Sequence, residues 1–272
     1  MAAEPVVSVV IVSFQARDYV LRCLDSLTRF VEAQHEAIVV DDGSTDGTAE
    51  AVRGRFPEVR VIAKRRNEGL VSGRNSALEM VRGRFVLMLD SDTEVRAGAV
   101  ESLLEALERD EGVGLVAPKL VYPSGELQLS ARRYPPLFMP LMRRGPIARF
   151  NPDPEAHRRH LMKDFDHATE RPVVWAAGAA QMWRADLPQR IGRFDPRVSS
   201  YGGEDLDWCL RVWEAGLEVR YVPRAVVVHD WQHVIGERRR SRARWRALRD
   251  WYYLQWKHRK LRNDPRLARA NA

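Results

Sequence analysis

The chain has little cysteine, with two among its 272 residues, Cys23 and Cys209. They lie far apart within apolar helical patterns, so we expect buried thiols of a reducing compartment and no disulfide. Long hydrophobic runs are also missing, because no window approaches the roughly 18 to 20 apolar residues that a membrane-spanning helix needs. The first residues lack a basic segment before their short apolar run, so we expect a strand and no secretion signal there. These absences predict a cytoplasmic protein, or one peripheral to the inner face of the cell membrane.

Strands and helices are expected to alternate through the first half of the chain. Apolar runs at 6–12, 36–42, 58–63 and 84–89 predict strands, and the segments between them have apolar residues at helical spacing. This alternation is typical of an α/β fold with a mainly parallel sheet, flanked by helices on both faces. The turn after the first strand reads SFQARDY and lacks G-x-G-x-x-G, which argues against a dinucleotide-binding enzyme.

The length and composition suit one large or two small domains. We expect a domain over residues 1–235, with a nucleotide-binding half at 1–120 and an acceptor-binding half at 121–235. Residues 131–171 are rich in Pro, Arg and His and have little periodicity, so they predict a loop insertion that is either a lid, a binding loop or disordered. Residues 236–272 are expected to form a basic, amphipathic helical tail.

Carboxylates follow the predicted strands at two places. The run FVLML ends in Asp90, Ser91 and Asp92, and the second strand ends in Asp41 and Asp42. Ligands of open α/β sheets bind at the carboxyl ends of strands, where paired carboxylates suit a divalent cation that carries phosphates. Capping of a turn or of the next helix is the simpler alternative for both pairs.

Two further positions of this kind occur in the second half. The segment GGEDLDWCLRVW places Glu204 and Asp205 at the start of a helix, and AVVVHD brings His229 to the end of another apolar strand. The two carboxylates could simply stabilise the helix N-terminus, by about 0.3 to 1 kcal/mol, and His229 could be a structural histidine. The recurrence of such residues at four element ends favours a shared ligand site.

Taken in order, these segments resemble the inverting glycosyltransferases of family 2, which have the GT-A fold, and especially the rhamnosyltransferase-like branch. The resemblance covers roughly residues 5–235 and rests on VSVVIVSFQARDYVLRCLDSL, IVVDDGSTDGT, NEGLVSGRNSAL, VLMLDSDTEV and YGGEDLDWCLRVWEAGLEVRYVPRAVVVHD. It implies transfer of a sugar from a UDP- or dTDP-linked donor to a saccharide or lipid-linked saccharide, in cell-envelope polysaccharide or glycolipid synthesis. It also implies Mn²⁺ or Mg²⁺ as cofactor.

The resemblance implies a donor site at the ends of the first strands. Asp42 would accept the N3–H of uracil or thymine, with Asp41 beside it as a weaker candidate. Arg74 would lie near phosphate or base edges. Phe14 stands where many relatives have Tyr or other polar residues, so we expect it to stack or pack. Gly178 lies in a small-residue segment that would either bring the backbone close to donor and acceptor or pack tightly.

The resemblance also implies a metal site, because Asp90 and Asp92 match the DXD motif. Asp92 would meet the metal that bridges the donor diphosphate, Asp90 would reach the ribose or a nearby water, and Ser91 lies between them. His229 matches a histidine that approaches the metal in related enzymes. An imidazole ligand is better tolerated by Mn²⁺ than by Mg²⁺.

Asp205 matches the catalytic base of these enzymes. An inverting transfer requires the acceptor hydroxyl to lose its proton as it attacks the anomeric carbon, and a metal that stabilises the leaving diphosphate replaces a general acid. Glu204 would help to hold the acceptor. Leu70 and Val71 replace the GFA common in the rhamnosyl branch, which leaves the sugar undefined.

Two other functions are kept as alternatives. One is a noncatalytic module that holds a nucleotide or saccharide on the same scaffold, which the intact acidic set disfavours. The other is a nucleotidyltransferase, for which SFQARDY lacks the Gly-rich, basic loop that should follow the first strand.

The net charge of +7 is concentrated near the C-terminus, where residues 237–262 hold eleven Arg and Lys against Glu237 and Asp250. Aromatic and apolar residues recur there at near-helical spacing, at Trp245, Leu248, Tyr252 and Trp256. Either this helix contacts the headgroups of an anionic membrane, or its aromatic stripe packs on the domain. A nucleic-acid partner is not expected, because basic charge outside the enzyme body is not a recognition motif.

Overall fold

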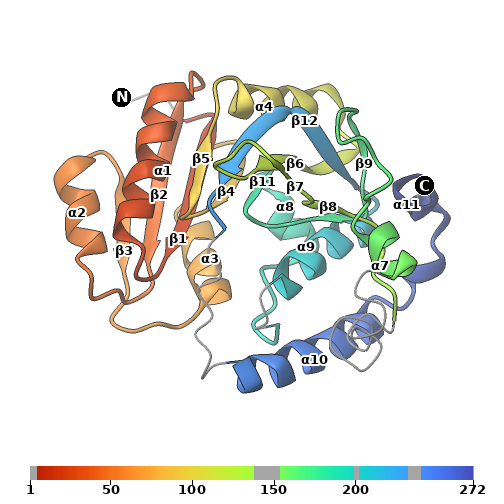
Figure 1. Ribbon diagram of the computed structural model, residues 1–272. Helices are drawn as coiled ribbons and strands as arrows, with labels where there is room; N and C mark the ends of the chain where they lie inside the picture. The colour runs from red at the N-terminus through yellow and green to blue at the C-terminus, as the bar shows by residue number, and fades with distance from the viewer. Residues whose placement is uncertain (1–4, 138–153, 199–201, 232–239, 272) are drawn as a thin grey trace.

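The computed structural model describes residues 5–137, 154–198, 202–231 and 240–271. Its strands are β1 (Val7–Ser13), β2 (His35–Asp41), β3 (Arg60–Ala63), β4 (Phe85–Asp90), β5 (Thr93–Val95), β6 (Val113–Val121), β7 (Leu127–Gln128), β8 (Ala131–Arg132), β9 (Arg171–Pro172), β10 (Trp175–Ala176), β11 (Ala180–Arg184) and β12 (Glu218–His229). Its α-helices are α1 (Arg17–Phe30), α2 (Thr48–Arg55), α3 (Leu70–Leu78), α4 (Ala99–Arg109), α7 (Glu155–His160), α8 (Leu187–Ile191), α9 (Gly203–Glu214), α10 (Arg240–Lys257) and α11 (Ala268–Asn271). Helices surround one large sheet (Figure 1).

The first four long strands form the parallel part of this sheet, in the order β3-β2-β1-β4. β1, β2 and β3 are rich in β-branched residues, and β4 is an apolar run. The helices α1, α2 and α3 connect these four strands in turn, which is why neighbouring strands point the same way. Val12 of β1 lies opposite both Val40 of β2 and Asp90 of β4. The carboxyl ends of β1, β2 and β4 therefore meet at one edge of the sheet, as the sequence predicts.

The second half of the sheet is mixed and continues in the order β11-β6-β12-β5. β11 runs antiparallel to both β4 and β6, whereas β12 runs parallel to β6 and antiparallel to β5. The last pairing places His229 opposite Thr93, and the Asp230 N–H donates to the Asp92 carbonyl at 2.9 Å. The end of β12 is thereby held beside the turn that follows β4.

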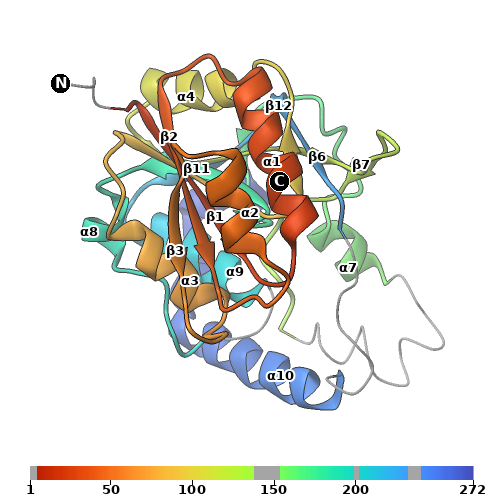
Figure 2. The same cartoon turned by 90° about the vertical axis from the view of Figure 1, so that its left-hand side faces the viewer.

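The core has two layers, one on each face of the sheet. Along β1, Val7, Val9 and Ile11 point into one layer, and Val10 and Val12 point into the other, as the two-residue period of a strand requires. Residues of α1, α2 and α4 complete the first layer, and residues of α3, α9 and α10 complete the second. Figures 1 and 2 show these helices on opposite sides of the strands, which confirms the predicted α/β arrangement.

The two cysteines are buried, Cys23 in the first layer and Cys209 in the second. Of the expected insertion at 131–171, residues 138–153 lie outside the described residues, and the remainder contains β8, α7 and β9. The expected helical tail is present as α10, followed by short 3-10 turns and α11. None of the described helices is both long enough and apolar enough to cross a bilayer.

Candidate functional site

The ends of β1 and β2 form one side of the candidate site. The Asp42 N–H donates to the Ser13 carbonyl at 2.8 Å, so the two strand ends lie together. Phe14 follows Ser13 and is 41% exposed, which is unusual for a large apolar side chain next to a buried strand. The exposed ring is available for stacking on a base, the first of the two roles that the sequence left open for Phe14.

Asp41 and Asp42 are both buried and both organise loops. The Asp42 carboxylate accepts the backbone N–H groups of Glu68, at 3.1 Å, and of Gly69, at 2.7 Å. Asp41 accepts the N–H of Ser44 at 3.0 Å. The simpler alternative, in which these carboxylates cap turns, therefore holds for both. Contact of Asp42 or Asp41 with a nucleotide stays a prediction.

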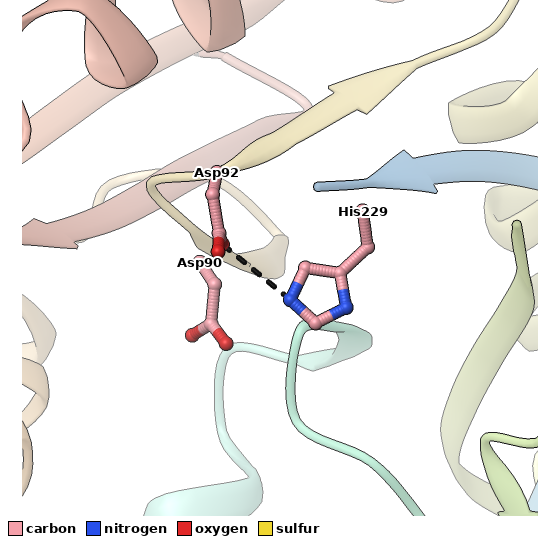
Figure 3. Close-up of side chains that lie close together, drawn as sticks. All are labelled: Asp90, Asp92 and His229. Atoms are coloured by element: carbon pink, nitrogen blue, oxygen red, sulfur yellow. Dashed lines mark ion pairs between the residues drawn. The ribbon is translucent and has the colours of Figure 1, made fainter. Parts of the chain in front are cut away.

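Three candidate metal ligands lie together where β4 ends and β12 ends. The ligand atoms of Asp90, Asp92 and His229 are within 4.8 Å of one another. Figure 3 shows the Asp92 and His229 side chains facing each other, with Asp90 beside them. The distance from His229 Nε2 to Asp92 Oδ1 is 3.5 Å. Ser91, between the two aspartates, is half-buried.

A neighbouring glutamine fixes the orientation of the His229 ring. His229 Nδ1 lies 2.8 Å from Gln128 Oε1, and Gln128 Nε2 donates to the His229 carbonyl at 2.6 Å. Because an amide oxygen is an acceptor, Nδ1 must carry the hydrogen, and Nε2 keeps its lone pair. Nε2 is buried and finds no hydrogen-bond partner among the described residues. This nitrogen faces the Asp92 and Asp90 carboxylates and lies 3.5 Å from Asp92 Oδ1, an arrangement that fits a divalent cation.

The electrostatics of these three side chains also favour a cation. Burial raises the pKa of Asp90 to about 6, with Arg74 opposing this shift and Asp92 adding to it. Burial lowers the pKa of His229, but the nearby Asp92 and Asp90 carboxylates bring it above its ordinary value. The raised pKa of His229 reflects the negative charge of Asp92 and Asp90 beside it, and a divalent ion bound there would neutralise that charge.

Arg74 connects this group of ligands to α9. Its guanidinium is 2% exposed and lies 3.3 Å from Asp90 Oδ1, 2.8 Å from Asp205 Oδ1 and 4.0 Å from Glu204 Oε1. It also donates to the Gly178 carbonyl at 3.3 Å. A buried cation with several carboxylate partners holds them at fixed positions. The sequence placed Arg74 near the donor but gave no indication of these partners.

The first turn of α9 presents Glu204 and Asp205, and both are buried. Gly202 caps this helix with φ of 80°, a left-handed conformation that glycine adopts at no steric cost. Asp205 accepts Arg74 through Oδ1 and the Gly178 N–H, at 2.8 Å, through Oδ2. Burial, followed by the charge of Asp205, raises the pKa of Glu204, although Arg74 opposes the shift.

Gly178 is required where it lies, because a Cβ atom there would overlap the Asp205 carboxylate. The small-residue segment was expected to bring the backbone close to another group. In the structure, the backbone of Gly178 approaches Asp205 of α9. The structure thus brings Asp90, Asp92, His229 and Asp205 into one continuous site, joined by Arg74. Asp41, Asp42 and Phe14 lie at the neighbouring ends of β2 and β1, and their part in the same site stays a prediction.

Comparisons with known proteins agree with this geometry. The model of the family "Glycosyl transferase family 2" matches residues 8–163. The N-acetylglucosaminyl-diphospho-decaprenol L-rhamnosyltransferase of Mycobacterium tuberculosis is 31% identical over 244 residues, which cover 85% of this chain and 78% of that protein. The pre-mycofactocin glycosyltransferase of the same organism is 33% identical over 198 residues, covering 71% of this chain and 37% of that protein.

Solved structures show the same fold at lower identity. GalNAc-T7 with UDP, GalNAc and Mn²⁺ superposes with a TM-score of 0.67 at 17% identity, over 94% of this chain and 48% of that chain. The mannosyltransferase PcManGT from Pyrobaculum calidifontis, in complex with GDP-Man and Mn²⁺, gives 0.57 at 20% identity, over 86% and 59%. This chain therefore spans less than two thirds of either solved chain.

Proposed function

This chain belongs to glycosyl transferase family 2, and we propose that it is a metal-dependent inverting member that uses a UDP- or dTDP-linked sugar. Its fold is that of the GT-A glycosyltransferases, and its activity is glycosyl transfer. The observation that carries the finer proposal is that the Arg74 guanidinium contacts both Asp90, one of the candidate metal ligands, and Asp205. These contacts would hold the metal-bound leaving group and the attacking hydroxyl at fixed positions relative to each other.

In this proposal Asp92, His229 and Asp90 hold Mn²⁺ or Mg²⁺. The bound metal would supply stabilisation of the charge that develops on the leaving nucleoside diphosphate. The His229 Nε2 beside Asp92 supports Mn²⁺ in particular, and the two solved structures of the same fold named above contain Mn²⁺. Asp42 and Phe14 would receive the base, within a donor-binding half formed by residues 1–120.

Asp205 is proposed as the base that takes the proton from the acceptor hydroxyl. Its two oxygens each accept one hydrogen bond, from Arg74 and from the Gly178 N–H, which leaves each oxygen a further lone pair. Glu204, whose pKa is raised by burial, would hold the acceptor. Residues 121–235 would form the acceptor-binding half. The decaprenol in the name of the mycobacterial relative supports a lipid-linked saccharide as acceptor.

The test is product analysis with two variants and a control. We expect wild-type enzyme to release nucleoside diphosphate and to form a glycoside whose anomeric configuration, read by NMR, is opposite to that of the donor. Asp205→Asn should lose at least about 100-fold in kcat while it still binds donor, and Asp92→Asn should lose metal-dependent donor binding. Asp186→Asn, at an exposed position before α8, should behave as wild type. Retention of configuration, or normal turnover by folded Asp205→Asn, would contradict the proposal.

A further inference from the structure

Helix α10 is anchored to the catalytic domain by one of its faces. Leu254 and His258 are buried, and the His258 ring lies 2.8 Å from Asp207 Oδ1 and 2.9 Å from Glu214 Oε1. Lys257 Nζ adds an ion pair to Asp207 at 2.6 Å. Asp207 and Glu214 both belong to α9, whose first turn carries the proposed base. The orientation of α10 is therefore fixed relative to the candidate site.

The opposite face of α10 presents large aromatic side chains to solvent. Trp245, Tyr252 and Trp256 are 73%, 49% and 63% exposed. Their spacings of seven and four residues place them in one row along the helix. α10 lies at the outer edge of the molecule in both views (Figures 1 and 2). We call these three residues the exposed aromatic face.

Arginines flank the exposed aromatic face. Arg246 and Arg259 are exposed, and the Arg259 guanidinium lies over the Trp256 ring, 5.2 Å from its centroid. The sequence places five more arginines between residues 238 and 244, at the start of the same segment. Exposed arginines therefore accompany the exposed aromatic face.

We propose that the exposed aromatic face docks on an anionic membrane surface. Tryptophan and tyrosine each combine an apolar ring with a polar group, which suits the boundary between headgroups and acyl chains. Arginines beside them would pair with lipid phosphates, and this charge complementarity selects a lipid surface as the occupant. Because α10 is anchored to α9, docking would hold the Asp205 site at a fixed height above the bilayer. The inference does not depend on the identity of donor or acceptor.

Vesicle co-sedimentation with the full chain tests this directly. We expect binding to vesicles of phosphatidylcholine with phosphatidylglycerol, weak binding to phosphatidylcholine alone, and loss of binding at high salt. The variant Trp245→Ser/Tyr252→Ser/Trp256→Ser should unfold at the same temperature as wild type, since these side chains are exposed, yet should bind at least about tenfold less. Arg246→Glu should weaken binding at least about fivefold, whereas the matched control Arg53→Glu, on α2, should not.

Three results would overturn the proposal. The first is a folded wild-type protein that does not bind anionic vesicles, and the second is a triple variant that binds them as well as wild type. The third is a wild-type dimer in analytical ultracentrifugation that becomes a monomer in the triple variant, because the exposed aromatic face would then join two copies of this chain. Neither readout uses catalysis, so failure here is distinct from failure of the proposed transferase mechanism.

Discussion

Removal of the Arg74 charge is expected to destabilise the protein strongly. The guanidinium is 2% exposed and within 4.0 Å of three carboxylates, Asp90, Glu204 and Asp205. Arg74→Met would fill most of the same space but leave these buried charges without their cation. Breaking one buried ion pair typically costs about 3 to 5 kcal/mol, which is a large share of the roughly 5 to 15 kcal/mol that stabilises a typical domain.

Equilibrium urea unfolding in EDTA measures this effect without interference from metal. Arg74→Met should unfold at a much lower urea concentration than wild type, and Arg53→Met, at an exposed position, should change the free energy of unfolding by less than about 0.5 kcal/mol. Arg74→Lys should fall in between, because one ammonium cannot replace a planar group that donates in several directions.

The double variant Arg74→Met/Asp205→Asn isolates the contribution of the Asp205 pair. Because Asp205→Asn removes a charge that Arg74→Met would leave unpaired, the double variant should be more stable than the sum of the single effects predicts, by about 0.5 to 3 kcal/mol. A loss below about 1 kcal/mol in Arg74→Met, or strict additivity in the double variant, would refute the reasoning that Arg74 holds the site together.

Three further predictions concern residues around the site and the tail. Gln128→Leu should weaken Mn²⁺ binding about 10- to 100-fold in calorimetric titration, whereas Gln128→Glu, which keeps an acceptor for His229 Nδ1, should lose much less; equal losses would contradict the orienting role. Gly178→Ala should cost about 1 to 3 kcal/mol in urea unfolding, because its methyl group overlaps the Asp205 carboxylate, while Gly54→Ala, in open space on α2, should be neutral or stabilising. Burial lowers the pKa of His258, but Asp207 and Glu214 raise it above its ordinary value. Its stabilising contribution should thus be fully present below about pH 6.5 and be lost as pH rises through the folded pKa. His258→Gln should flatten this dependence above about pH 6.5, and an unchanged profile would exclude His258 as its source.

Local patterns in the sequence were sufficient to predict the parallel half of the sheet. β1 and β2 are short β-branched runs and β4 is a short apolar run, and α4 buries Val100, Leu103, Leu104 and Leu107 at helical spacing. The direction of β11 was not predictable, because Ala180–Arg184 could pair either way and its orientation depends on partners far along the chain.

The candidate ligands could be predicted because each follows a strand or begins a helix. The contacts that connect these residues to one another could not be predicted. Arg74 and Asp205 are 131 residues apart, and Gln128 lies in a short strand whose sequence, LQ, carries no motif. Contacts of this kind depend on the packing of elements that are distant in sequence, and local hydrophobic periodicity does not predict them.

For the tail, the sequence left two orientations of the aromatic stripe open. The structure turns Trp245, Tyr252 and Trp256 outward and uses Lys257 and His258 for attachment. Charged residues are usually solvated, so hydropathy alone predicts that the aromatic side chains pack on the domain and that the charged side chains face solvent. The buried carboxylate partners on α9 decide the orientation, and they are visible only in the folded chain.

A metal site that receives a nucleoside diphosphate is central to the proposed mechanism, and calorimetric titration with UDP and dTDP tests for it most directly. With Mn²⁺ present, we expect one of the two nucleotides to bind wild-type protein, and EDTA or His229→Ala to abolish that binding. The control Asp186→Asn should bind as wild type. Equal binding in EDTA, or no binding of either nucleotide by folded protein with Mn²⁺, would contradict the assignment of Asp90, Asp92 and His229 as the metal ligands of the donor site.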